Sequence, residues 1–198
     1  MHNSYQRRVM AYFPLFIDMN HLKVLVVGGG TIATEKLEKL VDFTQEVSVI
    51  ALRVEDEAKE LIEKYNLVLE QRAYQVGDIK GFDIVIVATD TVTLHKEIYE
   101  ESRGSRILVN SVDNTEYCDF IFPSYVKKDA LTIAFSTGGA SPAFAKQIRQ
   151  HFEKIIPDSV GDFLEKMKAL RTTMPKGKER MQYFDTLVSE YFKKNFYS

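Results

Sequence analysis

Three consecutive glycines, Gly28 to Gly30, separate a short valine-rich run from a stretch with helical periodicity. The spacing to the next small residue is Gly28-x-Gly30-x-x-Ala33. Glycine permits the positive φ of a tight turn, and the absent side chain at Gly30 leaves room for a phosphate beside the backbone. The following helix offers unpaired N–H groups and the positive end of its dipole to an anion. The pattern predicts a pyrophosphate-binding loop, with an ordinary tight turn as the alternative.

The predicted contacts between this loop and a dinucleotide come from Gly28, Gly29, Gly30, Thr31, Ile32 and Ala33. An acidic residue usually ends the second strand of such a fold and holds the adenosine ribose. Here the chain reads Ala51-Leu52-Arg53 instead. Either the backbone near Leu52 and Arg53 holds the ribose, or Arg53 meets a 2′-phosphate and favours NADP, or Arg53 is simply solvated.

Two further strand ends carry polar side chains. Thr89 suits the edge of a cofactor site, and the adjacent Asp90 either joins it or only caps the next helix. Asn110 and Asp113 lie at the end of another strand, which is expected to end at the same edge of the sheet, and Asn110 is predicted to contact the substrate there. Asp113 is a candidate general base or metal-facing carboxylate, although an Asp before an Asn is more often a turn former.

A second glycine loop, "STGGASPAFAKQIR", spans residues 136–149. Ser141 is a good N-cap and Pro142 a good first helical residue. The loop residues Ser136, Thr137 and Gly138 are predicted to bind an anionic substrate. The cationic residues Lys146, Arg149, Lys127 and Lys128 are predicted to form a patch for a ligand with several carboxylates. The alternative is an ordinary capped helix with a solvated basic face.

The surrounding elements must place these loops at one sheet edge. Short apolar runs predict strands at 22–27, 47–52, 67–71, 83–88 and 106–110, and helical periodicity predicts helices at 34–43, 55–65 and 94–103. Alternation of this kind indicates an α/β fold with a Rossmann-type doubly wound parallel sheet. Strand pieces at 120–123 and 126, a strand at 130–136 and helices at 142–156, 159–170 and 178–192 follow.

Composition narrows the class of protein. The 198 residues are 45% hydrophobic and 27% charged, a balance typical of globular domains, and the net charge of −2 gives no general attraction to nucleic acid or membranes. The single cysteine, Cys118, allows no internal disulfide and fits a cytoplasmic setting. With the four histidines scattered along the chain, no metal site is predicted. No secretory signal or membrane span is expected.

Four stretches resemble the precorrin-2 dehydrogenase family, which also forms the N-terminal part of siroheme synthase. They are "YFPLFIDMNHLKVLVVGGGTIATEK", "VIVATD", "VNSVDNTEYCDFIFPS" and "LTIAFSTGGASPAFAKQIRQHFEKIIP". The resemblance covers most of residues 12–170, and its Asn-x-x-Asp and Ser-Thr-Gly-Gly-x-Ser-Pro elements together are rare elsewhere. The chain departs from the family pattern at Glu35 and near His95.

The resemblance implies NAD-dependent oxidation of precorrin-2, a tetrapyrrole, to sirohydrochlorin. It places the catalytic aspartate on Asp113 and favours NAD over NADP. It also implies a homodimer and, in some members, insertion of ferrous iron. The expected parts are an NAD-binding Rossmann domain at 1–112, a strand-rich dimerisation segment at 113–145 and a helical C-terminal domain at 146–198. The rival hypotheses are a dehydrogenase for another small anionic substrate and a non-enzymatic NAD-sensing module.

Overall fold

The computed structural model describes residues 12–197. It divides into two compact units, an N-terminal unit Tyr12–Ile121 and a C-terminal unit that begins at Phe122. The expected division into domains at 1–112, 113–145 and 146–198 stays a prediction. Residues 1–11 of the first domain and residue 198 of the last lie outside the described part of the chain.

Five parallel strands form the sheet of the N-terminal unit: β1 (Val24–Val27), β2 (Val47–Ile50), β3 (Val68–Glu70), β4 (Ile84–Val87) and β5 (Leu108–Ser111). Their order is β3-β2-β1-β4-β5, and Val24 lies opposite both Val47 and Ile84. Strand order reverses between β1 and β4, which is where open α/β sheets bind ligands. The predicted doubly wound parallel sheet is confirmed.

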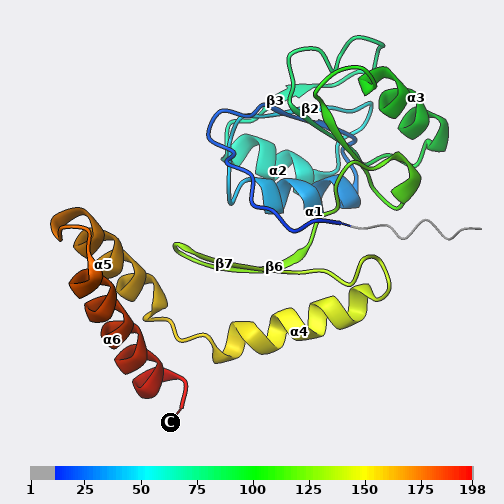
Figure 1. Ribbon diagram of the computed structural model, residues 1–198. Helices are drawn as coiled ribbons and strands as arrows, with labels where there is room; N and C mark the ends of the chain where they lie inside the picture. Colours follow the sequence, from blue (N-terminus) through cyan, green and yellow to red (C-terminus); the bar gives the residue numbers. More distant parts are fainter. Residues whose placement is uncertain (1–11, 198) are drawn as a thin grey trace, which may run out of the picture. The chain divides into compact units, whose positions relative to one another are not determined.

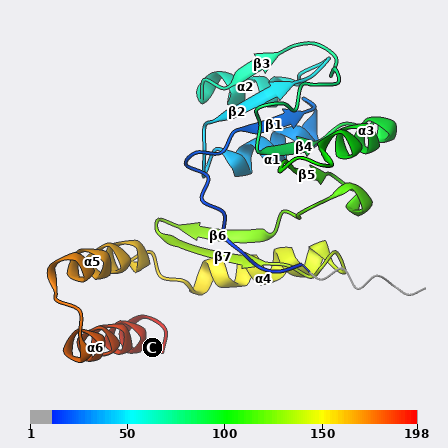
Figure 2. The ribbon, with the colours of Figure 1, turned by 45° about the horizontal axis from the view of Figure 1, so that its top comes forward.

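Three helices cover this sheet, α1 (Thr31–Leu40), α2 (Asp56–Lys64) and α3 (Val92–Ser102). Figures 1 and 2 show α1 and α2 side by side and α3 apart from them. Successive side chains of β1 and β4 point to opposite faces, and the buried residues Leu25 and Val85 pack with Ile98 of α3 in one core cluster. Because both faces are covered, β1 and β4 are buried along their whole length.

The start of α1 and one expected strand piece differ from the sequence-based expectation. Helix α1 begins at Thr31 rather than at residue 34, because Gly30 is its N-cap and accepts a hydrogen bond from the Thr34 amide at 3.0 Å. The predicted strand piece at 120–123 is wrong. The Phe120 carbonyl accepts the side-chain amide of Asn110 at 2.8 Å, and Pro123 has no N–H to donate to a ladder.

The C-terminal unit combines an antiparallel hairpin with three helices. The hairpin strands are β6 (Ser124–Lys128) and β7 (Leu131–Phe135), and the helices are α4 (Pro142–Ile155), α5 (Val160–Thr173) and α6 (Lys178–Asn195). Its core contains Val126, Ile156 and Val160. No helix in residues 12–197 combines the length and the apolar character needed to cross a bilayer.

Candidate functional site

The first glycine loop is pressed against the end of β4. Gly28 has φ +130°, and a Cβ added there would overlap the carbonyl oxygen of Ala88. The Gly28 amide donates to the Ile50 carbonyl at 2.9 Å, and the Ala88 amide donates to the Val27 carbonyl at 2.8 Å. Hydrogen bonds to β2 and β4 therefore fix the turn on both sides. Gly28 provides the tight turn that the sequence predicts at this position.

The start of α1 is shaped for an anion. Gly30 is the N-cap and has extended backbone angles. As a glycine it has no side chain to accept hydrogen bonds from the amides of the first turn. A Cβ added to Gly30 would meet only the Glu55 side chain within 4 Å. Ala33 is fully buried, which lets the helix lie close to the sheet. These features fit the pyrophosphate of a dinucleotide, which binds helix N-terminal amides where no Cβ intervenes.

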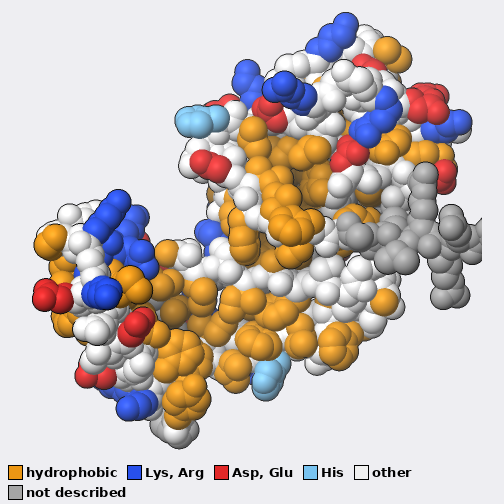
Figure 3. All heavy atoms as spheres, in the orientation of Figure 1, with side chains coloured by type: hydrophobic (Ala, Val, Ile, Leu, Met, Phe, Trp, Pro, Cys, Tyr) orange, Lys and Arg blue, Asp and Glu red, His pale blue; other side chains and the backbone are white. Residues whose placement is uncertain are grey.

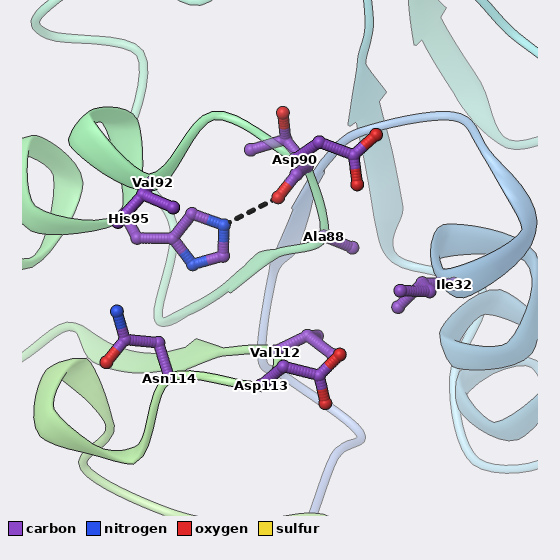
Figure 4. A pocket seen from close by; sticks show the side chains of 9 residues that line it. Ile32, Ala88, Asp90, Val92, His95, Val112, Asp113 and Asn114 are labelled. Carbon is purple, nitrogen blue, oxygen red and sulfur yellow. Dashed lines mark hydrogen bonds between the residues drawn. The ribbon is translucent and has the colours of Figure 1, made fainter.

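A pocket of about 220 Å³ opens where β4, β5 and the start of α1 meet. Its lining residues are Ile32, Ala88, Thr89, Asp90, Val92, His95, Val112, Asp113 and Asn114 (Figure 4). The volume lies below the roughly 300–1,000 Å³ of pockets that enclose whole drug-sized ligands. It suits a single ring, with the rest of a larger ligand lying outside it.

Asp113 sits in a turn directly after β5. Its φ is +61°, a left-handed conformation that Asp tolerates better than most residues. The preceding amide, of Val112, donates to the Val87 carbonyl at 2.9 Å and ties this turn to β4. In Figure 4 the Asp113 carboxylate lies on the side of the pocket that faces Ile32, opposite His95. The structure thus brings Asp113 together with Ile32 and Thr89, three residues singled out from the sequence.

Lys36 is a neighbour of this site that sequence analysis missed. It lies on α1, one turn beyond Ile32. Burial lowers the pKa of Lys36 and Lys39 adds to that effect, whereas the negative charges of Glu35 and Asp113 act in the opposite direction. Lys36 therefore lies close enough to Asp113 for their charges to interact. The only sequence signal for Lys36 was its spacing. It follows Ile32 by four residues, which places both residues on one side of the helix.

His95 was also missed as a pocket residue. Its side chain is 4% exposed, and Nε2 lies 2.7 Å from the Thr89 carbonyl oxygen. A carbonyl only accepts, so Nε2 carries the proton and holds the Thr89 loop in place. Nδ1 is buried and has no hydrogen-bond partner within residues 12–197. His95, Ile98 and Ser102 share the buried side of α3, and this helical spacing was the sequence signal that could have identified His95 as a buried residue.

The sequence left open whether Asp90 caps the next helix. The N-cap of α3 is Thr91, so Asp90 does not cap that helix.

A closed loop after β5 positions Asp113. Asn110 is 5% exposed, and its amide nitrogen donates to the Phe120 carbonyl. The Ser111 amide donates to the Cys118 sulfur at 3.2 Å. The Asp119 amide donates to the Val109 carbonyl at 2.7 Å. Burial raises the pKa of the Cys118 thiol, which fits a packing role. Asn110 thus helps to close the loop, and its contact with substrate stays a prediction.

The Asp119 carboxylate holds the two ends of this loop. Its Oδ2 accepts from the Val109 amide at 2.8 Å, and both of its oxygens accept from the Arg103 guanidinium at 2.7 and 2.9 Å. Partial burial alone would raise the pKa of Asp119. The hydrogen bonds and charge of Arg103, with the Val109 amide, hold that pKa below its ordinary value.

We expect Asp119→Asn to lower the free energy of unfolding by about 1–2 kcal/mol at pH 7, because hydrogen bonds to a charged group are lost. A carboxyl whose pKa is lower in the folded state stabilises the fold above its unfolded pKa, and this contribution is lost as pH falls through the folded pKa. The gap between wild type and variant should therefore close below about pH 4 in urea titrations. Glu63→Gln, in an exposed ion pair with Lys59, should change stability by less than about 0.5 kcal/mol. A gap that persists unchanged to pH 2.5 would contradict this account.

The end of β2 presents Leu52 and Arg53 to solvent outside the pocket. Leu52 is 71% exposed, an unusual state for a large apolar side chain beside a buried strand. Neither residue lines the pocket described above. Their contact with the adenosine end of a cofactor stays a prediction.

The second glycine loop belongs to the C-terminal unit. Ser141 is the N-cap of α4 and accepts the Phe144 amide at 3.2 Å, and Pro142 is in the first turn. The Ser136 hydroxyl accepts the Gly138 amide, and the Thr137 hydroxyl accepts the Ser141 amide. Both hydroxyls therefore shape the loop, and their hydrogens remain available as donors.

The predicted cations of this unit are partly paired. Arg149 Nη1 lies 2.6 Å from Glu153 on the same helix. Lys128 Nζ lies 2.7 Å from both the Asp158 carboxylate and the Ile156 carbonyl oxygen. Lys146 is exposed on α4, one turn before Arg149. Substrate contacts of Lys146 and Arg149 stay predictions, with Arg149 sharing its charge with Glu153.

Two family models match the chain. The model described as "Putative NAD(P)-binding" matches residues 15–124, more than half of the chain. The model described as "Sirohaem biosynthesis protein central" matches residues 128–155. The first match contains the glycine loop and the pocket, and the second contains the second glycine loop and α4.

Individual siroheme synthases and one solved structure are also similar to this chain. A siroheme synthase of Pseudoalteromonas atlantica is 38% identical over 162 residues, which are 80% of this chain and 35% of that protein. A siroheme synthase of Mannheimia succiniciproducens is 32% identical over 190 residues, 92% of this chain and 39% of that protein. The chain thus spans about a third of the length of the curated relatives it matches. A solved structure described as SirC, precorrin-2 dehydrogenase, is 25% identical with a TM-score of 0.74, and the match covers 87% of this chain and 86% of that one.

Proposed function

The chain belongs to the NAD(P)-binding family found in siroheme synthases, and on that premise we propose that it oxidises precorrin-2 to sirohydrochlorin with NAD. The observation that carries the proposal is the pocket at the β1–β4 reversal, where Asp113 faces the start of α1 across a ring-sized space. The likeness to the structure described as a precorrin-2 dehydrogenase supports the choice of substrate.

Each part of the loop region has a role toward the cofactor. The amides at the start of α1, from Thr31 to Ala33, hold the pyrophosphate, and Leu52 and Arg53 lie toward the adenosine end. Thr89, held by His95, borders the nicotinamide side of the site. NAD bound there supplies the hydride acceptor for carbon oxidation.

The reaction removes a hydride from a macrocycle carbon and a proton from the macrocycle. Asp113 accepts that proton at its carboxylate, and Lys36 lies close enough for the two charges to interact. The peripheral carboxylates of the tetrapyrrole are bound by Ser136, Thr137, Gly138, Lys146 and Arg149. Hydroxyl, amide and cationic donors of this kind match carboxylate acceptors.

A direct assay tests the proposal. The purified chain is incubated anaerobically with precorrin-2 and NAD, and the absorbance of sirohydrochlorin and of NADH is followed. We expect both products in equal amounts and no turnover without NAD. Tight NAD binding with no precorrin-2 oxidation would overturn the proposal. Oxidation of a different small anion would then favour a dehydrogenase of another substrate, and binding without any oxidation would favour an NAD sensor.

A homodimer and ferrous iron as a second substrate also belong to this proposal. The β6–β7 hairpin pairs with no other strand in the described residues, so the outer edges of both strands lack a strand partner there. Figure 3 shows hydrophobic side chains gathered over the region of β6, β7 and α4, where Phe144 and Ile155 are exposed. A second copy pairing with the hairpin would satisfy these edges. Iron insertion is tested by adding ferrous ion and sirohydrochlorin without NAD.

A further inference from the structure

Glu55 supplies a carboxylate close to the place where the sequence lacks the usual ribose-binding acid. The end of β2 has no acidic residue, but three residues after Leu52 the chain returns to the first glycine loop at Glu55. Glu55 is the N-cap of α2 with extended backbone angles, and its amide donates to the Gly29 carbonyl at 2.8 Å. This main-chain bond brings the residue against the first glycine loop.

The Glu55 carboxylate reaches over the start of α1. Its Oε2 accepts the Thr31 hydroxyl at 3.0 Å, and its Oε1 lies 3.4 Å from the position of a Cβ on Gly30. Within the described residues, the Thr31 hydroxyl is the only hydrogen-bond donor to this carboxylate, which is exposed. A carboxylate has about four acceptor sites, so most of them remain open to a ligand at the loop.

We propose that Glu55 accepts hydrogen bonds from the adenosine ribose and makes the site prefer NAD to NADP. The inference rests on the proposed function in one respect only, namely that the ligand of the first glycine loop is a nicotinamide dinucleotide. A carboxylate beside the second glycine can bind ribose hydroxyls, whereas a 2′-phosphate there would meet like charge. Asp56 and Glu57 follow Glu55 directly in the first turn of α2, so three carboxylates come within four residues after Arg53 in the sequence. The local charge disfavours the 2′-phosphate that Arg53 alone would attract.

The test is cofactor binding to the full chain, measured by calorimetry for NADH and NADPH at one fixed ionic strength. We expect the wild-type protein to bind NADH at least about 10-fold more tightly than NADPH. Glu55→Gln should weaken NADH binding and strengthen NADPH binding, lowering the preference at least about 10-fold. Glu57→Gln removes the same charge two residues away without touching the loop, and should change the preference less than about twofold. Thermal unfolding confirms that each variant is folded.

Three outcomes would overturn the inference. The first is an unchanged preference in Glu55→Gln. The second is equal strengthening of both cofactors, which would mean that Glu55 only obstructs the loop. The third is an equal effect of Glu57→Gln. Because the readout is binding without precorrin-2, a failed oxidation assay would leave this inference standing.

Discussion

Replacing Asp113 with Asn is expected to lower the turnover number for precorrin-2 oxidation by at least about 100-fold, the usual worth of a positioned general base. The dissociation constant of NAD should stay within about twofold, because the proposed pyrophosphate contacts come from the start of α1 and not from Asp113. The amide keeps the shape of the side chain but cannot accept a proton. Stopped-flow single-turnover kinetics with saturating NAD separates the chemical step from binding.

Asn is the right replacement because of the backbone. Asp113 has φ +61°, which Asn adopts readily and Ala adopts at a cost of about 1–2 kcal/mol. Asp129 also has a left-handed conformation, with φ +50°, and lies in the β6–β7 turn. Asp129→Asn is therefore a matched control, and we expect it to leave turnover within about twofold of wild type. Unchanged turnover in Asp113→Asn would remove Asp113 from proton transfer.

Substituting Ala for Gly28 should lower the free energy of unfolding by about 3–5 kcal/mol, a large effect for one methyl group. The added Cβ would overlap the Ala88 carbonyl oxygen, and the φ of +130° is unfavourable for any L side chain. Relief by movement is blocked, because hydrogen bonds to Ile50 and Ala88 fix the loop to both neighbouring strands. Urea unfolding followed by far-UV circular dichroism measures the loss.

A substitution at Gly104 separates the cost of the steric clash with Ala88 from the cost of positive φ. Gly104 also has positive φ, +81°, but an added Cβ would meet nothing within 4 Å. Gly104→Ala should therefore cost only the backbone strain, about 1–2 kcal/mol. If both variants lost the same stability, the close approach of Gly28 to β4 would not be important to the fold.

Local sequence determined most of the secondary structure and the position of the first loop. A short run of β-branched valines favours a strand buried between two covered faces, and the glycines that follow it permit the turn into the helix. These signals act over a few residues, so they predicted β1, the Gly28 turn and the cap of α4 by Ser141 and Pro142. The strand piece at 120–123 failed because the partner of Phe120 is Asn110, a side chain ten residues away.

What the tertiary structure alone decided is which distant side chains meet at the site. The α1–β2–α2 connection brings Glu55 to Thr31 across 24 residues, and the order β1-β4-β5 brings Asp113 toward Ile32. His95 and Lys36 carry no motif, and their roles come from the chain segments that pack around them. The sequence by itself therefore predicted the class of fold and the glycine turn before α1. Asp113 was already a candidate from the sequence, but its meeting with Ile32 and the approach of Glu55 to Thr31 followed only from the tertiary structure, because such contacts depend on packing rather than on spacing along the chain.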